Sequence, residues 1–294
     1  MPINSSLASL SDMAFGTAFV IYLLALVLSV IFYVKAAGDK PEGASKFIGM
    51  TQTLVWLGIL VHMVSVITRG LATHRFPFGN LYEYIAMITL FAMVAAAVFM
   101  QRREFKSLWP WVLVPVLSLL FLGGKNLYAD AAPVVPALQS VWLPIHVSIV
   151  SSGASIGLIS GIASLAYLLR RWQPEGKEKG FFGKLARPLP SAKRLDLVAY
   201  RTAIITVPVF GLGIILGAIW AESAWGRPWN WDPKETFSLI TWFLYAAYLH
   251  ARATSGWQNT KAAWINILAL AAMTFNLFFI NLVTSGLHSY AGLN

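Results

Sequence analysis

The sequence predicts an all-α fold: a polytopic integral membrane protein built from transmembrane helices. Of its 294 residues, 57% are hydrophobic and only 12% are charged, whereas a soluble domain carries about 25% charged residues. Apolar runs of about 20 residues, the length that a helix needs to cross the hydrocarbon core, recur along the whole chain. Backbone polar groups in lipid must be satisfied within their own segment, so we expect these runs to be helical.

We expect about eight spans, which together form one domain over residues 1–294. Asn80 and Glu83 fit a capping box that begins the third span. The fourth span is short and contains Pro110 and Pro115, so it could be a broken or re-entrant helix. The expected spans are 14–36, 47–68, 81–100, 109–123, 143–169, 199–221, 236–253 and 262–285.

The distribution of positive charge predicts the orientation. Sixteen of the 22 Lys and Arg residues fall in alternate loops on one side of the expected spans, and five fall on the other side. The positive-inside rule places the basic side in the cytoplasm, so both termini and the segment 222–236 are expected outside it. On this interpretation the basic segment 170–198 is a cytoplasmic linker, and the net charge of +10 reflects topology rather than nucleic-acid binding.

The composition also excludes some chemistry. The chain contains no cysteine, so it cannot perform thiol redox chemistry or hold a haem through a thioether bond of its own. It has no phosphate-binding loop of the G-x-x-x-x-G-K-[ST] type, so any energy from ATP would come from another protein.

A tryptophan-rich segment, 222–236, separates the sixth and seventh spans. Trp225, Trp229 and Trp231 lie within seven positions there. Three aromatic faces where hydrocarbon meets water would suit a large, flat, partly apolar ligand, and haem is the obvious candidate. The alternative is an ordinary aromatic belt, although such a belt places tryptophans at helix ends rather than in a loop that contains Gly and Pro.

The residues that follow the tryptophans fit a helix start. Asp232 is expected to be the N-cap, Pro233 the first helical residue and Glu235 the partner that completes a capping box. This arrangement would fix the tryptophan segment to the start of the seventh span.

Two of the five histidines are expected to lie in the same layer as the tryptophans. His146 is near the outer end of the fifth span, and His288 follows the outer end of the eighth. Neutral imidazoles on opposite faces of a haem would fill both axial positions of the iron. Alternatively, these interfacial histidines only form hydrogen bonds with loops or lipid headgroups.

The other histidines are expected elsewhere. His250 lies roughly 14 residues into the seventh span, about 20 Å from its outer end, so an inner haem site would need a ligand from another protein. A packed interface histidine is equally consistent with this position. His62 falls in the outer half of the second span, and His74 in an outer loop. Three arginines on the outer side could meet haem propionates or act as interfacial anchors: Arg69, Arg75 and Arg227.

Two motifs resemble a known family. The pattern Trp225-Gly226-x-x-Trp229-x-Trp231-Asp232 resembles the WWD domain of the haem-handling proteins of cytochrome c maturation. The continuation PKE, the chain length and the eight spans are most similar to the CcsA (ResC) branch of the System II pathway. Residues 76–83, which read FPFGNLYE, also resemble that branch.

The resemblance implies a set of site residues. The external iron ligands would be His146 and His288, and the transmembrane ligand would be His250. The missing inner ligand would come from a ResB/CcsB-type membrane partner. The residues of this chain that match the haem-handling motif are Trp225, Gly226, Trp229, Trp231 and Asp232.

The resemblance also implies a function. Haem b (iron protoporphyrin IX), the transported substrate, would be received near the cytoplasmic face and displayed at the outer tryptophan segment. There the thiols of an apocytochrome c Cys-x-x-Cys-His motif would attack its vinyl groups. The chain would thus be a subunit of a System II cytochrome c synthase (haem lyase). No residue is assigned as a separate acid, base or nucleophile.

Three alternatives remain at this point. A haem exporter would use the same sites without an apocytochrome. A membrane electron carrier would retain its haem b permanently, and a solute transporter would use no haem. The membrane we expect is the bacterial cytoplasmic membrane, with the thylakoid membrane as the alternative.

Overall fold

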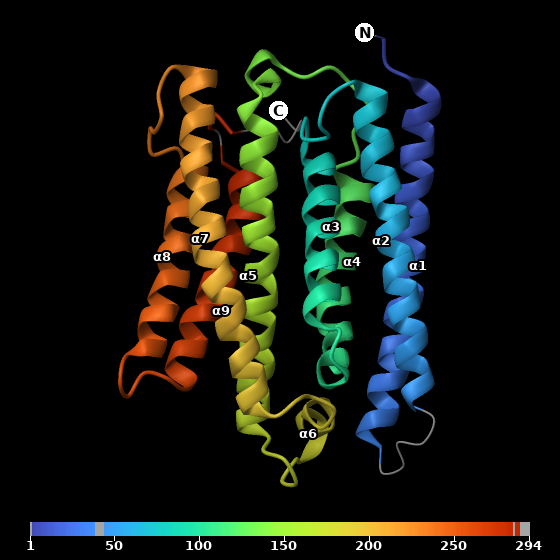
Figure 1. Cartoon of the computed structure of the whole chain (residues 1–294), viewed down its shortest axis with the longest axis vertical. Coiled ribbons are helices and arrows are strands. Elements are labelled where there is room, and N and C mark those ends of the chain that lie inside the picture. The colour runs from blue at the N-terminus through green and yellow to red at the C-terminus, as the bar shows by residue number, and fades with distance from the viewer. Residues whose placement is uncertain (1, 39–43, 285, 289–294) are drawn as a thin grey trace.

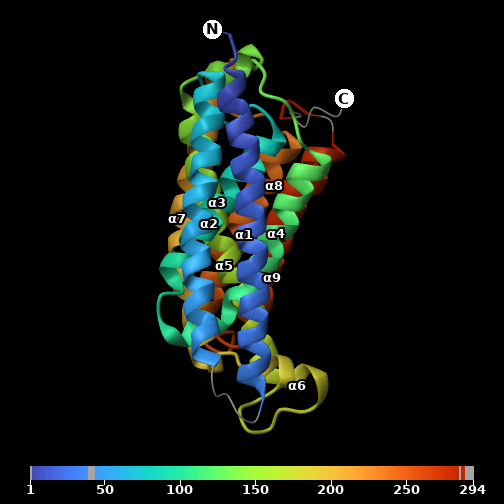
Figure 2. The same cartoon turned by 90° about the vertical axis from the view of Figure 1, so that its right-hand side faces the viewer.

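The protein is a bundle of long helices whose axes run in nearly one direction. The computed structural model describes residues 2–38, 44–284 and 286–288, and none of these lies in a strand. Figures 1 and 2 show the long helices running side by side along one axis. The predicted all-α fold is therefore confirmed. The helices are α1 (Ser5–Ala37), α2 (Ala44–Thr73), α3 (Leu81–Phe99), α4 (Trp109–Asn126), α5 (Trp142–Trp172), α6 (Gly180–Ala186), α7 (Ala192–Trp225), α8 (Pro233–Ala253) and α9 (Thr260–Phe275).

Shorter helical segments complete these elements. Two are 3-10 helices, η1 (Arg103–Leu108) before α4 and η2 (Pro136–Gln139) before α5. The third, η3 (Asn276–Ile280), is a π-helical turn that continues α9. Such turns are rare and frequently occur at functional sites.

The helices are long and apolar enough for a polytopic membrane protein. Seven helices of the described chain meet this criterion: α1, α2, α3, α4 extended by η1, α5, α7 and α9 extended by η3. The remaining long helix, α8, has 21 residues and packs against α7 and α9. It coincides with the predicted span 236–253. Its tyrosines, threonines and terminal charges lower its mean hydropathy, so it is not among the seven.

The fourth span is a continuous helix, so the expectation of a broken or re-entrant segment is wrong. Pro110 stands in the first turn of α4, where no backbone N–H is needed. Pro115 lies inside the helix without ending it. Together with η1, α4 forms a span over Glu104–Asn126.

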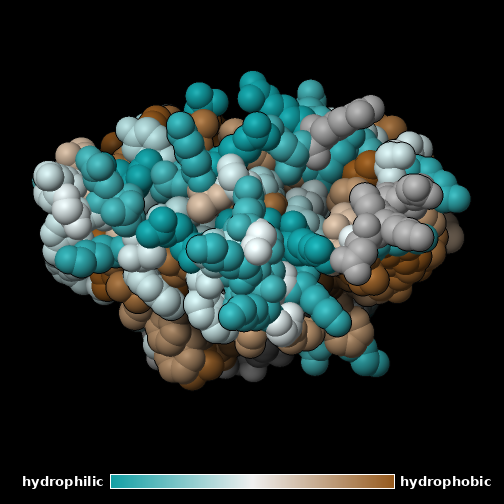
Figure 3. Space-filling view, turned by 90° about the horizontal axis from the view of Figure 1, so that it is seen from below, coloured by the Kyte–Doolittle hydropathy of each residue, from teal (hydrophilic) through white to brown (hydrophobic). Residues whose placement is uncertain are grey.

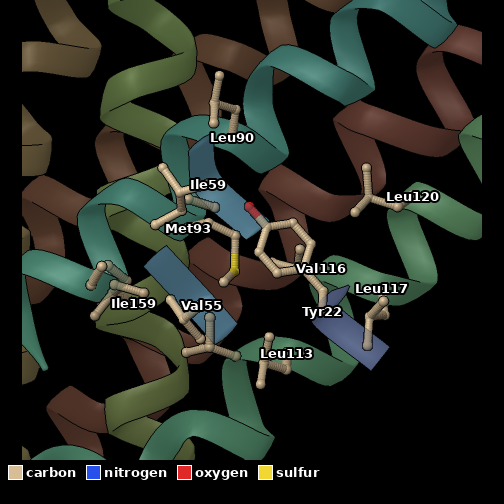
Figure 4. Packing of buried hydrophobic residues seen from close by; sticks show 14 of the residues in the cluster. Tyr22, Val55, Ile59, Leu90, Met93, Leu113, Val116, Leu117, Leu120 and Ile159 are labelled. Atoms are coloured by element: carbon tan, nitrogen blue, oxygen red, sulfur yellow. The ribbon is translucent and has the colours of Figure 1, made fainter. Parts of the chain in front are cut away.

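The helices form two groups that meet along α3 and α5. One group contains α1 to α4, and the other contains α5, α7, α8 and α9 (Figure 1). The first group surrounds the largest hydrophobic cluster. Figure 4 shows Tyr22, Val55, Met93 and Leu113 of this cluster, one from each of the four helices, converging on one another.

The second group is packed closely around α5. A Cβ added at Gly153 would lie 2.7 Å from the backbone nitrogen of Phe210 in α7. Small residues at such contacts let helix backbones approach. A buried amide adds polar contacts between α5 and α9, because Asn266 donates to Ser160 and Ser164.

The expected linker 170–198 is shorter in the structure, because α5 continues to Trp172 and α7 begins at Ala192. The residues between them carry α6 and fold back onto the end of α5. Buried Arg170 holds them by donating to Glu178 (2.8 Å) and to the carbonyl of Leu189 (2.8 Å). Figure 3 looks at this end of the bundle and shows hydrophilic residues across its middle and hydrophobic residues along its rim.

Gly153→Leu is expected to lower the free energy of unfolding by about 1–3 kcal/mol, because the side chain would overpack the α5–α7 contact. The matched control is Gly16→Leu, since a Cβ there meets nothing within 4 Å. Thermal unfolding of both variants in one detergent measures the difference. Equal melting temperatures would contradict the close-packing role of Gly153.

Candidate functional site

The tryptophan segment begins at the end of α7 with a left-handed residue. Trp225 is the last residue of α7, and Gly226 follows with φ +69°, donating its N–H to the carbonyl of Glu222. Glycine adopts this conformation without steric cost. Trp231 also has a positive φ, +57°, so the loop depends on two left-handed residues.

The predicted capping box at the start of α8 is confirmed. Asp232 accepts from the backbone N–H of Lys234 at 3.0 Å. The carboxylate of Glu235 accepts from the backbone N–H groups of Asn230 (2.9 Å) and Asp232 (3.2 Å). The loop is therefore fixed to the first turn of α8 at several points.

The three tryptophans of the loop meet their neighbours edge to face. Trp225 contacts His288 with ring centroids 5.0 Å apart and an interplanar angle of 77°. Trp229 and Trp231 are 5.6 Å apart at 89°. Trp231 is 67% exposed, whereas Trp229 lines a cavity in the bundle. The segment thus contributes one ring to the cavity wall and one to the surface.

A fourth tryptophan, not identified from the sequence, contacts both His146 and His288. Trp220 stacks on His146 at 5.9 Å and 8°, and meets His288 at 5.5 Å. It also contacts Trp225 at 4.7 Å. Its indole donates to the carbonyl of Ala137 at 3.1 Å, which fixes the ring. Trp220 lies outside the recognised motif, and no pattern in the sequence indicated it.

His146 is held by a hydrogen bond across the α5–α7 contact. Its Nδ1 lies 2.8 Å from the carbonyl oxygen of Gly213. Because a carbonyl only accepts, Nδ1 must donate, and the neutral ring then carries its lone pair on Nε2. A Cβ at Gly217 would lie 2.7 Å from the ring, so glycine makes room for the imidazole there.

His288 is held by Asp232. Its Nδ1 lies 3.0 Å from Oδ1 of this carboxylate, and the backbone N–H of Leu287 donates to Oδ2 at 2.9 Å. Burial alone would raise the pKa of Asp232, but the hydrogen bond and charge of His288 and the N–H groups of Lys234 and Leu287 hold that pKa below its usual value. The ionised carboxylate accepts only, so Nδ1 of His288 donates as well.

The two histidines therefore share one hydrogen-bond arrangement, although their partners differ. Each uses Nδ1 as a donor, to a carbonyl in one case and to a carboxylate in the other. Such partners fix the tautomer and orientation of metal-binding histidines and leave Nε2 for the metal. The structure thus brings together His146, His288 and the tryptophan segment, as the sequence predicted.

Both histidines line a cavity of about 470 Å³ between the two helix groups. Its volume is within the usual range for small-molecule sites, about 300–1,000 Å³. Its walls are mainly apolar and come from α3, α4, α5, α7, α8, α9, η3 and the tryptophan segment. A smaller cavity of about 100 Å³ also has His146, His288 and Trp220 in its wall.

The three arginines considered for propionates are paired with acids of the chain itself. Arg75 contacts Glu83 at 2.7 Å, and Arg69 contacts the same carboxylate at 3.0 Å. Glu83 is buried, so this cluster ties α2 to the start of α3. Arg227 contacts Glu235 at 3.3 Å. The geometry favours the structural alternative for all three.

The remaining histidines are separate from this site. His250 lies at the other end of α8, exposed on an outward face with Ile240 and Phe243. His62 is fully buried against aromatic rings of α1. His74 is exposed in the loop after α2, with φ +53°.

Comparison with known proteins decides the family. The cytochrome c assembly protein family matches residues 17–288. The chain belongs to this family and is of the CcsA type. It is 33% identical to cytochrome c biogenesis protein CcsA of Guillardia theta, over 93% of this chain and 95% of that one. With the CcsA of Synechococcus sp. (strain RCC307) the identity is 31%, over 98% and 96%.

A solved structure shows the same fold. Cytochrome c heme lyase CcmF superposes with a TM-score of 0.67 at 18% identity, over 92% of this chain and 46% of that chain. This CcsA-type chain therefore corresponds in fold to about half the length of CcmF. The family establishes a role in cytochrome c biogenesis for this multi-pass membrane protein, and with it the handling of haem.

Asp232→Ala is expected to lower the free energy of unfolding by about 1–2 kcal/mol, because α8 loses its N-cap. Asp232→Asn keeps a capping oxygen and should cost less. Thermal unfolding of the two variants and the wild type in one detergent measures both effects. Wild-type stability of the alanine variant would show that the cap and the contacts to residues 287 and 288 contribute nothing.

Proposed function

We propose that this chain binds haem b between His146 and His288 and presents it for covalent attachment to an apocytochrome c. It would act as the haem-handling subunit of a System II cytochrome c synthase. Membership of the CcsA type supports the pathway. The observation that carries the proposal is the shared state of the two imidazoles: both engage Nδ1 and both line one cavity.

Two such imidazoles can supply both axial ligands of one iron. The apolar walls of the cavity suit the porphyrin, while the chain supplies ligation and orientation to a reactive cofactor that it does not keep. In the attachment step, each apocytochrome thiol adds across a vinyl C=C bond. A C–S bond forms at one vinyl carbon and the thiol proton passes to the other, so no oxidant is consumed.

The proposal includes a direction of transport. The end of the bundle that carries α6 would face the cytoplasm, because the basic loops gather there. Both termini and the tryptophan segment would then be extracytoplasmic. The membrane would be the bacterial cytoplasmic membrane.

An inner haem site would be shared with a second protein. His250 is exposed on an outward face of α8, and Ile240 and Phe243 on the same face are apolar. A ResB/CcsB-type partner that covers this face could supply the other axial ligand. Haem would then pass from the inner site to the outer one.

His146→Ala and His288→Ala are each expected to abolish the low-spin haem spectrum of the purified chain and to stop cytochrome c maturation. Each variant removes one axial ligand, so the remaining haem should become high-spin or be lost. Absorption spectra of the reduced proteins measure this, with His74→Ala as a control from an exposed loop. Added imidazole should restore part of the low-spin signal. Normal maturation in both variants without imidazole would refute the assignment.

A single-turnover experiment separates transfer from retention. The haem-loaded chain with its partner is reduced and mixed with an apocytochrome c that carries a Cys-x-x-Cys-His motif. Covalent haem on the apocytochrome, detected after denaturing electrophoresis, supports the proposal. Haem that stays on the chain through repeated redox cycles would favour an electron carrier, and haem released free would favour an exporter.

A further inference from the structure

The cavity between the helix groups contains one cationic side chain, Lys234, that forms no direct ion pair with a described carboxylate, although the charge of nearby Asp232 acts on it. Among the described residues that line it, Lys234 is the one lysine or arginine. It also lines the smaller cavity, together with His146 and His288. The acid in the wall of the larger cavity, Glu235, is already bound to Arg227 and to backbone N–H groups.

The contacts of Lys234 are neutral. Its ammonium donates to the side-chain oxygen of Asn281 and lies 5.8 Å from the centroid of the Tyr84 ring. Asn281 is oriented for this role, since its amide donates to the carbonyl of Leu277 at 2.7 Å. Lys234 forms no ion pair with a described carboxylate, and three N–H donors on one ammonium leave capacity for another acceptor.

A second polar group in the wall is also incompletely bonded. Asn276, the first residue of the π-helical turn, is 92% buried and lines the cavity. Its amide nitrogen donates to the hydroxyl of Ser238 at 3.0 Å, while its side-chain oxygen has no partner. Ser238 therefore accepts through its oxygen and retains a hydroxyl proton to donate. This unpartnered oxygen is an acceptor, so a donor such as water could complete it, whereas a carboxylate could not.

The two donors in the wall, Lys234 and Ser238, suit a carboxylate. An ammonium and a hydroxyl donor that face a mainly apolar cavity interact strongly with an anion, because the low dielectric weakens screening. We infer that Lys234, with Ser238 beside it, binds a propionate of the porphyrin in this cavity. This inference rests on the proposed function and names the residue that orients the haem edge.

The three arginines considered for the propionates are less suited to this role than Lys234. Arg69 and Arg75 share the carboxylate of Glu83, and Arg227 is paired with Glu235. The charge of each arginine is therefore already shared with a carboxylate of the chain. Lys234 could bind a propionate by giving up only its hydrogen bond to the side chain of Asn281. Ser238 lies one turn after Lys234 on α8, so both donors are on one helix face.

The test compares ferric protoporphyrin IX with its dimethyl ester, in which both carboxylates are masked. Each is titrated into the full-length chain in detergent and followed by its absorption band. The wild type is expected to bind the diacid about tenfold more tightly than the ester. Lys234→Met should weaken binding of the diacid about tenfold, leave the ester unchanged and keep the low-spin spectrum at saturation.

The controls separate the possible failures. Lys261→Met is the matched control, since this exposed lysine lies beside Trp257 at the other end of the bundle. Lys234→Arg should retain a preference for the diacid, and Lys234→Gln replaces the methionine variant if that one does not fold. Equal wild-type affinity for both porphyrins, or an unchanged preference in the neutral variants, would overturn the inference and leave the proposed function standing. Failure of the wild type to bind either porphyrin would overturn both.

Discussion

One carboxylate connects the parts of the site around His146 and His288. Asp232 caps α8 through the N–H of Lys234, accepts from the backbone of Leu287 and holds the imidazole of His288. Placing a carboxylate in a partly buried position is costly unless donors surround it, and here three donors do so. The tryptophan segment, the start of α8 and the residues after the last helix therefore depend on the same two oxygen atoms.

The second histidine depends on a different constraint, the close approach of α5 and α7. The bond from His146 to the carbonyl of Gly213 is possible only because the two backbones nearly touch at Gly153 and because Gly217 leaves room for the ring. Overpacking anywhere along this contact would move the imidazole away from its acceptor. The fold and the site are thus linked through glycines that have no chemistry of their own.

Much of this could be predicted from the sequence, but not all of it. Hydropathy predicted the long helices. The capping box could be recognised because it depends only on Asp232, Pro233 and Glu235, which are neighbours in the sequence. The position of His146 and His288 at the same end of the bundle as the tryptophan segment followed from helix length. Their neighbours did not, because hydropathy defines how deep a residue lies and not which helix it faces. The contacts of Trp220 and the pairing of Arg69 with Glu83 depend on that packing.

The two histidines differ in how firmly they are held, and this bears on the proposed transfer of haem. His146 belongs to the first turns of a 31-residue helix and is bonded to a second helix, so moving it requires both to shift. His288 follows the last helix and is held mainly by Asp232 and contacts with Trp220 and Trp225. If the two histidines are the axial ligands, as proposed, exchange with an incoming histidine would cost least at His288, because His288 is held by a hydrogen bond and ring contacts rather than by the packing of two helices. Under the proposed function, His146 would keep the iron while His288 gives way.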